Sequence, residues 1–190
     1  MFSMILIRLF DFIISFFLFI LFIPVIILII LILFLSQGKP IFYISERVGL
    51  RGKKFSMYKF RTMSEKISKN ENDKITTFGK YLRRSSLDEL PQLINVLKND
   101  MSFVGPRPLP LNIENQLNPS FITIRRSVKP GLTGYAQILY KKKKRSWDEK
   151  VKLDIIFIEN FSILKYLKIL FLTFPVLVKR FLFNPKGDSL

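Results

Sequence analysis

The sequence of 190 residues contains neither cysteine nor histidine. Without thiols it has no disulfide framework, no cysteine nucleophile and no cysteine-ligated zinc or iron–sulfur centre. Without imidazole it has no Ser-His-Asp or Cys-His machinery and no histidine-ligated metal. Any enzyme chemistry must therefore come mainly from carboxylates, lysine, serine, threonine or tyrosine, and oxygen ligands would suit a hard ion such as Mg²⁺.

Negative charge is also scarce, with 14 acidic residues against 31 basic ones and a formal net charge of +17. The only charged residues in the segment 1–38 are Arg8 and Asp11, whose charges cancel. The whole net charge therefore lies in the rest of the chain. This distribution excludes an ordinary soluble globule. A body this basic is expected to meet an anionic partner, which can be phospholipid headgroups, nucleic acid or a phosphate-bearing small molecule.

A long apolar run stands near the N-terminus. Residues 12–35 carry no charge, and as a helix they would extend about 36 Å, enough to cross a hydrocarbon core of about 30 Å. Pro24 lies in the middle, where it clashes with the carbonyl of residue 20. Two arrangements fit, a kinked transmembrane helix or a helix that bends at Pro24 and re-enters the same leaflet. Basic residues at both flanks, Arg8 and Lys39, favour re-entry, because positive charge prefers the cytoplasmic side.

The remainder predicts a mainly helical fold with a small β-hairpin. Residues 41–63 contain two β-type runs around Gly49 and Gly52, which is typical of a hairpin. The polar composition of residues 64–74 predicts a mobile loop, and a short basic helix is expected over 77–84.

Further along, apolar spacing predicts an amphipathic helix that ends near Asn99. The proline-rich segment 105–110 can be neither helix nor central strand, and Pro130-Gly131 predicts another turn. The last 40 residues combine high hydrophobicity with interspersed lysines, which favours helices lying in the membrane interface.

The adjacent acids Asp88 and Glu89 have the most informative setting of all the carboxylates. Pro91 would clash with the carbonyl of residue 87 in a running helix, so a helix should begin near Asp88 with both acids in its first turn. Its free N–H groups and dipole would keep the acids ionised and attract phosphate. Two interpretations stay open at this point. One acid attacks phosphorus while the other holds Mg²⁺, or Ser86 and Glu89 merely form a capping box.

Several basic side chains could bind a phosphate group near this acid pair. Arg107 stands between Pro106 and Pro108, so a stiff backbone would hold its guanidinium for bidentate contact. Arg83 lies just upstream of the acids, and Lys59 lies on the second predicted strand. The unbroken basic run at 141–145 is more typical of a solvated or lipid-facing patch.

Taken together, these residues resemble the bacterial sugar transferases, and specifically the small monotopic phosphoglycosyl transferases that begin glycoconjugate assembly on polyprenyl phosphate. The resemblance covers essentially the whole chain, in the family's order and spacing. The matching stretches are Tyr58–Met63, Phe78-Gly79, Ser86–Leu93, Asn95–Lys98, Asp100–Leu109, Lys129–Gln137 and Leu153-Asp154.

The resemblance implies a reaction in two displacements. Asp88 would attack the β-phosphate of a UDP-sugar and release UMP, and polyprenyl (undecaprenyl) phosphate would then take the sugar-phosphate from the aspartate. Glu89 would help to hold Mg²⁺ as the metal ligand. Arg107, Lys59, Arg83 and Asp154 become the candidates for binding substrate or phosphate.

The resemblance also implies an architecture and a location. Residues 1–38 would form a re-entrant helix bent at Pro24, and residues 39–190 a compact catalytic body, on the cytoplasmic face of the bacterial inner membrane and in contact with phospholipids. The product would enter a pathway such as lipopolysaccharide or capsule synthesis, with the oligomeric state open. The family's Ser-Pro pair is Ile23-Pro24 here, and the chain departs from the family again after Gln137, where sugar specificity is in doubt.

One alternative from another functional class is a membrane-anchored scaffold without catalysis, in which the acid pair would be only a cap. Another is a membrane-tethered basic protein that binds nucleic acid or anionic lipid without catalysis. It is motivated only by the net charge of +17. The chain has no recognised nucleic-acid motif with interleaved aromatic residues, so we expect no nucleic-acid partner.

Overall fold

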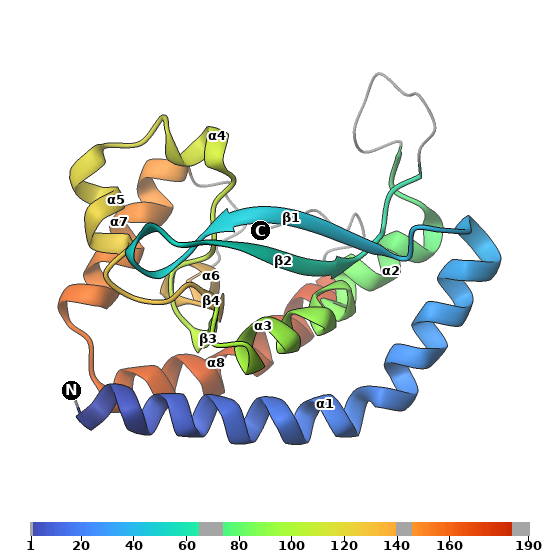
Figure 1. Cartoon of the computed structure of the whole chain (residues 1–190), viewed down its shortest axis with the longest axis horizontal. Helices are drawn as coiled ribbons and strands as arrows, with labels where there is room; N and C mark the ends of the chain where they lie inside the picture. The colour runs from blue at the N-terminus through green and yellow to red at the C-terminus, as the bar shows by residue number, and fades with distance from the viewer. Residues whose placement is uncertain (1, 65–73, 140–145, 184–190) are drawn as a thin grey trace.

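The computed structural model describes residues 2–64, 74–139 and 146–183, which form a mainly helical chain with two small sheets (Figure 1). Most of the polar segment 64–74 and the basic run 141–145 lie outside the described residues. The mainly helical class with a hairpin is therefore confirmed, and the cytoplasmic placement of the body stays a prediction.

The long helix α1 (Phe2–Gln37) contains Pro24 and bends partway along its length (Figure 1). Its Ile5–Gln37 stretch is long and apolar enough to cross a membrane, by length and composition. Proline removes a helical hydrogen bond and is the common cause of such bends. Residues before the proline, such as Phe10, pack on the core around Tyr166, and residues after it, such as Leu33, pack on the core around Phe60.

The predicted hairpin is present. Strand β1 (Phe42–Val48) pairs antiparallel with β2 (Lys54–Phe60), and a short 3₁₀ turn, η1 (Leu50–Gly52), joins them. Side chains alternate along a strand, so Lys59 shares a face with the buried Phe55 and Met57. This alternation points Lys59 toward the body rather than outward.

The predicted basic helix is also present as α2 (Thr77–Ser85), with Thr76 accepting a hydrogen bond from Gly79 N as its N-cap. The single amphipathic helix expected after it is divided into a 3₁₀ helix, η3 (Leu87–Gln92), and a short α3 (Leu93–Leu97). Pro91 explains the division, because a residue without an N–H cannot continue a regular α-helical ladder.

A second sheet was not expected from the sequence. Strand β3 (Ser102–Val104) runs parallel to β4 (Gly131–Thr133), where only a turn was predicted. The two segments approach so closely that a Cβ on Gly131 would lie 2.1 Å from Gly105 N. Only glycine fits at this position, because any side chain would collide with the backbone of Gly105. Nothing in the positions of Gly105 and Gly131 along the sequence indicated that they are in contact. Beyond β3, the proline-rich segment is an irregular loop, as predicted.

Two short helices lie between β3 and β4, and a third follows β4 and leads to the C-terminal part. They are α4 (Leu111–Glu114), α5 (Pro119–Arg125) and α6 (Tyr135–Ile138). The two final helices, α7 (Trp147–Glu159) and α8 (Ile163–Phe183), confirm the helical prediction for this region, and their place in the membrane interface stays a prediction.

Buried polar contacts fix α1 to the body. Asp11 accepts hydrogen bonds from Ser102 Oγ at 2.6 Å and from the hydroxyl of Tyr166 on α8. Arg8 donates to the carbonyls of Val96 at 2.6 Å and Leu97 at 2.9 Å, at the end of α3. The two charges of the N-terminal segment therefore serve as attachment points, because a buried charged group needs such partners.

Candidate active site

Four side chains from three elements converge beside η3. Glu89 Oε1 lies 2.6 Å from Lys59 Nζ, which β2 supplies, and 2.8 Å from Arg107 Nη2, which comes from the loop after β3. Asp88 is buried at 7% exposure, and its Oδ2 lies 4.0 Å from the same Lys59 nitrogen. The sequence placed these residues in separate elements, and the fold brings them together.

The electrostatics of this cluster depend on the two cations. Burial by itself would raise the pKa of Glu89, but the charges of Arg107 and Lys59 and their hydrogen bonds hold it well below its usual range. The carboxylate of Glu89 in turn raises the pKa of Arg107 against the opposing effect of burial. These two cations account for the lowered pKa, without the helix dipole that the sequence suggested.

The capping-box interpretation of Ser86 and Glu89 is wrong. Ser86 takes a left-handed conformation (φ 60°) and its side chain makes no capping hydrogen bond. The carboxylate of Glu89 instead contacts Lys59 and Arg107. A capping box needs the acid to accept a hydrogen bond from the N-cap backbone, and here its Oε1 accepts from the two cations instead.

Asn95 is a residue that sequence reasoning missed. It is fully buried on α3, where its Nδ2 donates to Ser56 O at 2.7 Å and its Oδ1 accepts from Tyr58 N at 3.2 Å. Asn95 therefore pairs with backbone groups on the edge of β2 that faces away from β1, as a third strand would. These bonds fix the position of the strand that carries Lys59. Only its place in the matched stretch Asn95–Lys98 could have signalled it.

We therefore predict that Asn95→Leu destabilises the protein. The change keeps the branched shape of the side chain, at a somewhat larger volume, but leaves two backbone groups of β2 without a partner, each costing about 1–3 kcal/mol. Thermal unfolding in detergent should show a clear drop in melting temperature, whereas Asn160→Leu, at an exposed helix end, serves as the control. A variant that melts with the wild type would contradict this role for Asn95.

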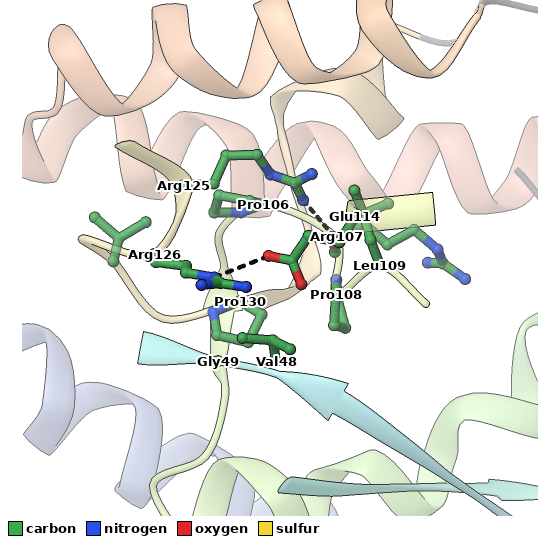
Figure 2. Close-up of a pocket in the computed structure, with 11 residues that line it drawn as sticks. Val48, Gly49, Pro106, Arg107, Pro108, Leu109, Glu114, Arg125, Arg126 and Pro130 are labelled. Atoms are coloured by element: carbon green, nitrogen blue, oxygen red, sulfur yellow. Dashed lines mark hydrogen bonds and ion pairs between the residues drawn. The ribbon is translucent and has the colours of Figure 1, made fainter. Parts of the chain in front are cut away.

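Arg107 is held from behind by a second pair of charges. Arg125 Nη2 donates to the backbone carbonyl of Arg107 at 2.6 Å (Figure 2). The same nitrogen lies 3.4 Å from Asp154 Oδ2 on α7. Burial raises the pKa of Asp154 to about 7, opposed by the positive charges of Arg125 and Lys150. Asp154 is thus linked to Arg107 only through Arg125 among the described contacts. No contact between Asp154 and the acid pair is found in the described residues, and its role in binding substrate stays a prediction.

The small pocket in Figure 2 lies behind this loop and encloses only about 20 Å³, room for about one water molecule. The Glu114 carboxylate points into it, where Oε1 accepts from Arg126 Nε at 3.1 Å. The pocket is too small for a nucleotide-sugar. Within it, Arg125 supports the loop through its hydrogen bond to the carbonyl of Arg107.

Arg83 is attached to the end of the hairpin. Its Nε donates to Thr62 Oγ1 at 2.8 Å, at the end of β2. Arg61, which precedes Thr62, donates to Gln37 O at 2.6 Å and Gly38 O at 2.8 Å and so caps the end of α1. Phosphate binding by Arg83 stays a prediction.

The residues present fit a hard divalent ion. In the described parts of the chain, no group of three or more acidic side chains forms a metal cluster. Mg²⁺, however, is commonly held by one or two carboxylates together with substrate phosphates. Asp88 and Glu89 supply such oxygens, and both cation contacts of Glu89 use Oε1 rather than Oε2.

Comparison with known proteins gives concordant matches. The profile of the bacterial sugar transferase family matches residues 2–180. A protein named "Uncharacterized sugar transferase EpsL" from Bacillus subtilis is 43% identical over 180 residues, which cover 90% of this chain and 86% of that protein.

Two further relatives carry a named activity. The "UDP-glucose:undecaprenyl-phosphate glucose-1-phosphate transferase" of Escherichia coli is 39% identical over 73% of this chain, and the chain spans 33% of it. The "UDP-N-acetylgalactosamine-undecaprenyl-phosphate N-acetylgalactosaminephosphotransferase" of Aeromonas hydrophila is 33% identical over 75% of this chain, and the chain spans 36% of it. The chain therefore corresponds to about a third of these longer relatives.

Proposed function

The chain belongs to the bacterial sugar transferase family, and we propose that it transfers a sugar-1-phosphate from a UDP-sugar to polyprenyl phosphate, with undecaprenyl phosphate as the acceptor and UMP as the released product. The observation that carries the proposal is the convergence of Asp88, Glu89, Lys59 and Arg107 at one buried position. An acid pair flanked by two cations suits the transfer of a phosphoryl group between anionic partners.

In the first displacement, a carboxylate oxygen of Asp88 attacks the β-phosphorus of the donor. A new O–P bond forms while the bond to the oxygen bridging toward the α-phosphate breaks, and UMP leaves with that oxygen. In the second, a phosphate oxygen of the acceptor attacks the same phosphorus and the acyl-phosphate bond breaks. Asp88 returns as a carboxylate, so no net proton is needed.

The other charged residues position and neutralise the reacting groups. Lys59 lies within reach of both acids, so it keeps negative charge at the nucleophile without binding it tightly. Arg107 presents a guanidinium that Glu89 and the loop behind it hold in place. Asp88 and Glu89 would hold Mg²⁺, which when bound offsets the charge of the substrate phosphates.

The contacts of α1 support a re-entrant helix. Near its start, Arg8 is bonded to α3, and at its end Gln37 donates to Thr76 Oγ1 at 3.1 Å while Arg61 caps its last carbonyls. Both ends are thus attached to one body, and a helix that crossed the bilayer would place them on opposite sides. We propose that the body lies on the cytoplasmic face of the inner membrane, where UDP-sugars are made.

The direct test is a screen of UDP-sugars with undecaprenyl phosphate in detergent or nanodiscs, scoring UMP and a lipid-linked sugar diphosphate. We expect one donor to give both products in equal amounts, and chelation of divalent ions by EDTA to reduce the rate at least about a hundredfold. Added Mg²⁺ should restore it. Turnover that persists in EDTA would contradict the metal role, and the absence of UMP with every donor would contradict the proposed reaction.

A further inference from the structure

A second, larger pocket of about 200 Å³ opens beside the acid pair. Its walls come from η3 and α3, from β3, from the end of β4 and α6, and from the middle of α8, which passes beneath the β3–β4 pair (Figure 1). Glu89 and Arg107 stand at its charged end. Most of the remaining lining is aliphatic, with contributions from Leu90, Leu132, Leu170, Val176 and Leu177.

The charged end suits an anionic head. Arg107 carries five N–H donors, of which the contact with Glu89 engages Nη2. Of the polar side chains in the lining, Thr133 and Thr173 bond to each other at 2.8 Å and Gln137 donates to Leu132 O at 3.3 Å. The interior therefore offers few partners to uracil or ribose and suits a hydrocarbon chain better. A ligand that matches both ends has a phosphate joined directly to a hydrocarbon chain.

Helix α8 places this pocket next to the apolar surface of the molecule. Leu170, Val176 and Leu177 line the pocket, whereas Phe171 and Phe174 on the same helix are 75% and 72% exposed. One helix therefore separates the pocket from a strongly apolar outer face. A hydrocarbon chain leaving the pocket would meet an environment of the same kind.

The size of the pocket limits what it can hold. An apolar cavity of about 150 Å³ accommodates benzene, so about 200 Å³ accommodates roughly one or two five-carbon units. A longer chain must continue outside, along α8 or in the bilayer.

We propose that this pocket binds the first isoprenoid units of the lipid acceptor, with the phosphate at Arg107 and the chain between Leu132 and α8. The inference rests on the proposed transfer reaction and adds to it the place where the acceptor binds. It requires the acceptor phosphate to attack the phosphorus opposite Asp88, on the side that UMP has left, while the hydrocarbon chain extends toward α8.

The test separates the two half-reactions. Val176→Trp fills the pocket, and Val178→Trp, two residues along the same helix where the side chain is 41% exposed, is the matched control. Stoichiometric UMP release without acceptor should be within about twofold of wild type in both variants. The KM for undecaprenyl phosphate should rise at least about tenfold in Val176→Trp alone.

Unchanged acceptor KM in Val176→Trp, with normal UMP release, would overturn the pocket assignment while leaving the transfer reaction intact. Failure of the wild type to release UMP would instead contradict the reaction itself.

A second measurement covers the case in which Val176→Trp fails to fold. The wild-type protein is labelled with a prenyl phosphate that carries a photoreactive diazirine in its first isoprene unit, and the crosslinked peptides are identified by mass spectrometry. We expect labels on α8 and on the segment from Leu132 to Ile138. Labels confined to α1 would overturn the proposal.

Discussion

Asp88→Asn is expected to lower the rate of UMP release at least about a thousandfold and to abolish the covalent sugar-phosphate intermediate. The amide keeps the shape of the buried side chain, but its oxygen is a far weaker nucleophile than a carboxylate oxygen. The decisive measurement uses a donor labelled in the β-phosphate without acceptor, followed by denaturing gel and peptide mapping. Label should appear on Asp88 in the wild type and be lost in the variant.

The matched control is Asp148→Asn, because Asp148 lies exposed in the first turn of α7. It should retain wild-type turnover and labelling. An Asp88→Asn protein that still releases UMP at a comparable rate would show that another group attacks phosphorus. Loss of activity with an unchanged melting temperature would distinguish a chemical role from a failure to fold.

Glu89→Gln is expected to cause the second largest effect, acting on both stability and turnover. It leaves Lys59 and Arg107 close together, largely buried and without the negative charge between them. Removing one partner of a buried charge pair typically costs about 3–5 kcal/mol. We expect a lower melting temperature, at least about a hundredfold slower UMP release and a weaker response to Mg²⁺.

The pH dependence of this variant gives an independent check. The pKa of Glu89 is depressed from its ordinary value of 4.5, so its stabilising charge is fully present above that pH and is lost as the pH falls below it. The difference in stability between wild type and Glu89→Gln should therefore be constant near neutral pH and shrink in acid. Glu159→Gln, at an exposed position on α7, should show no such difference. A stability difference between wild type and Glu89→Gln that stays constant into strong acid would argue against the depressed pKa of Glu89.

Much of the chemistry could be predicted from the sequence, because it depends on local composition. The absence of cysteine and histidine limited the reacting groups to a few types, and the apolar run with Pro24 indicated a bent membrane helix. The stretches around Asp88 and Arg107 were specific enough to indicate the family, which the profile match then confirmed. The hairpin followed from strand and turn propensities over a short range.

Contacts between distant segments could not be predicted in this way. The bonds from Asn95 to β2 and from Arg125 to Arg107 join residues far apart in sequence, and neither pattern nor spacing encodes such pairings. The same holds for the close approach of Gly105 and Gly131.

The sequence by itself determined which groups could react and which segment could enter a membrane, since side-chain chemistry and hydropathy are local properties. Only the tertiary structure decided that Lys59 and Arg107, rather than a helix dipole, hold Glu89 ionised, and that an apolar pocket opens beside it. Charge interactions and cavities depend on distances through space, and those distances are set when the whole chain packs.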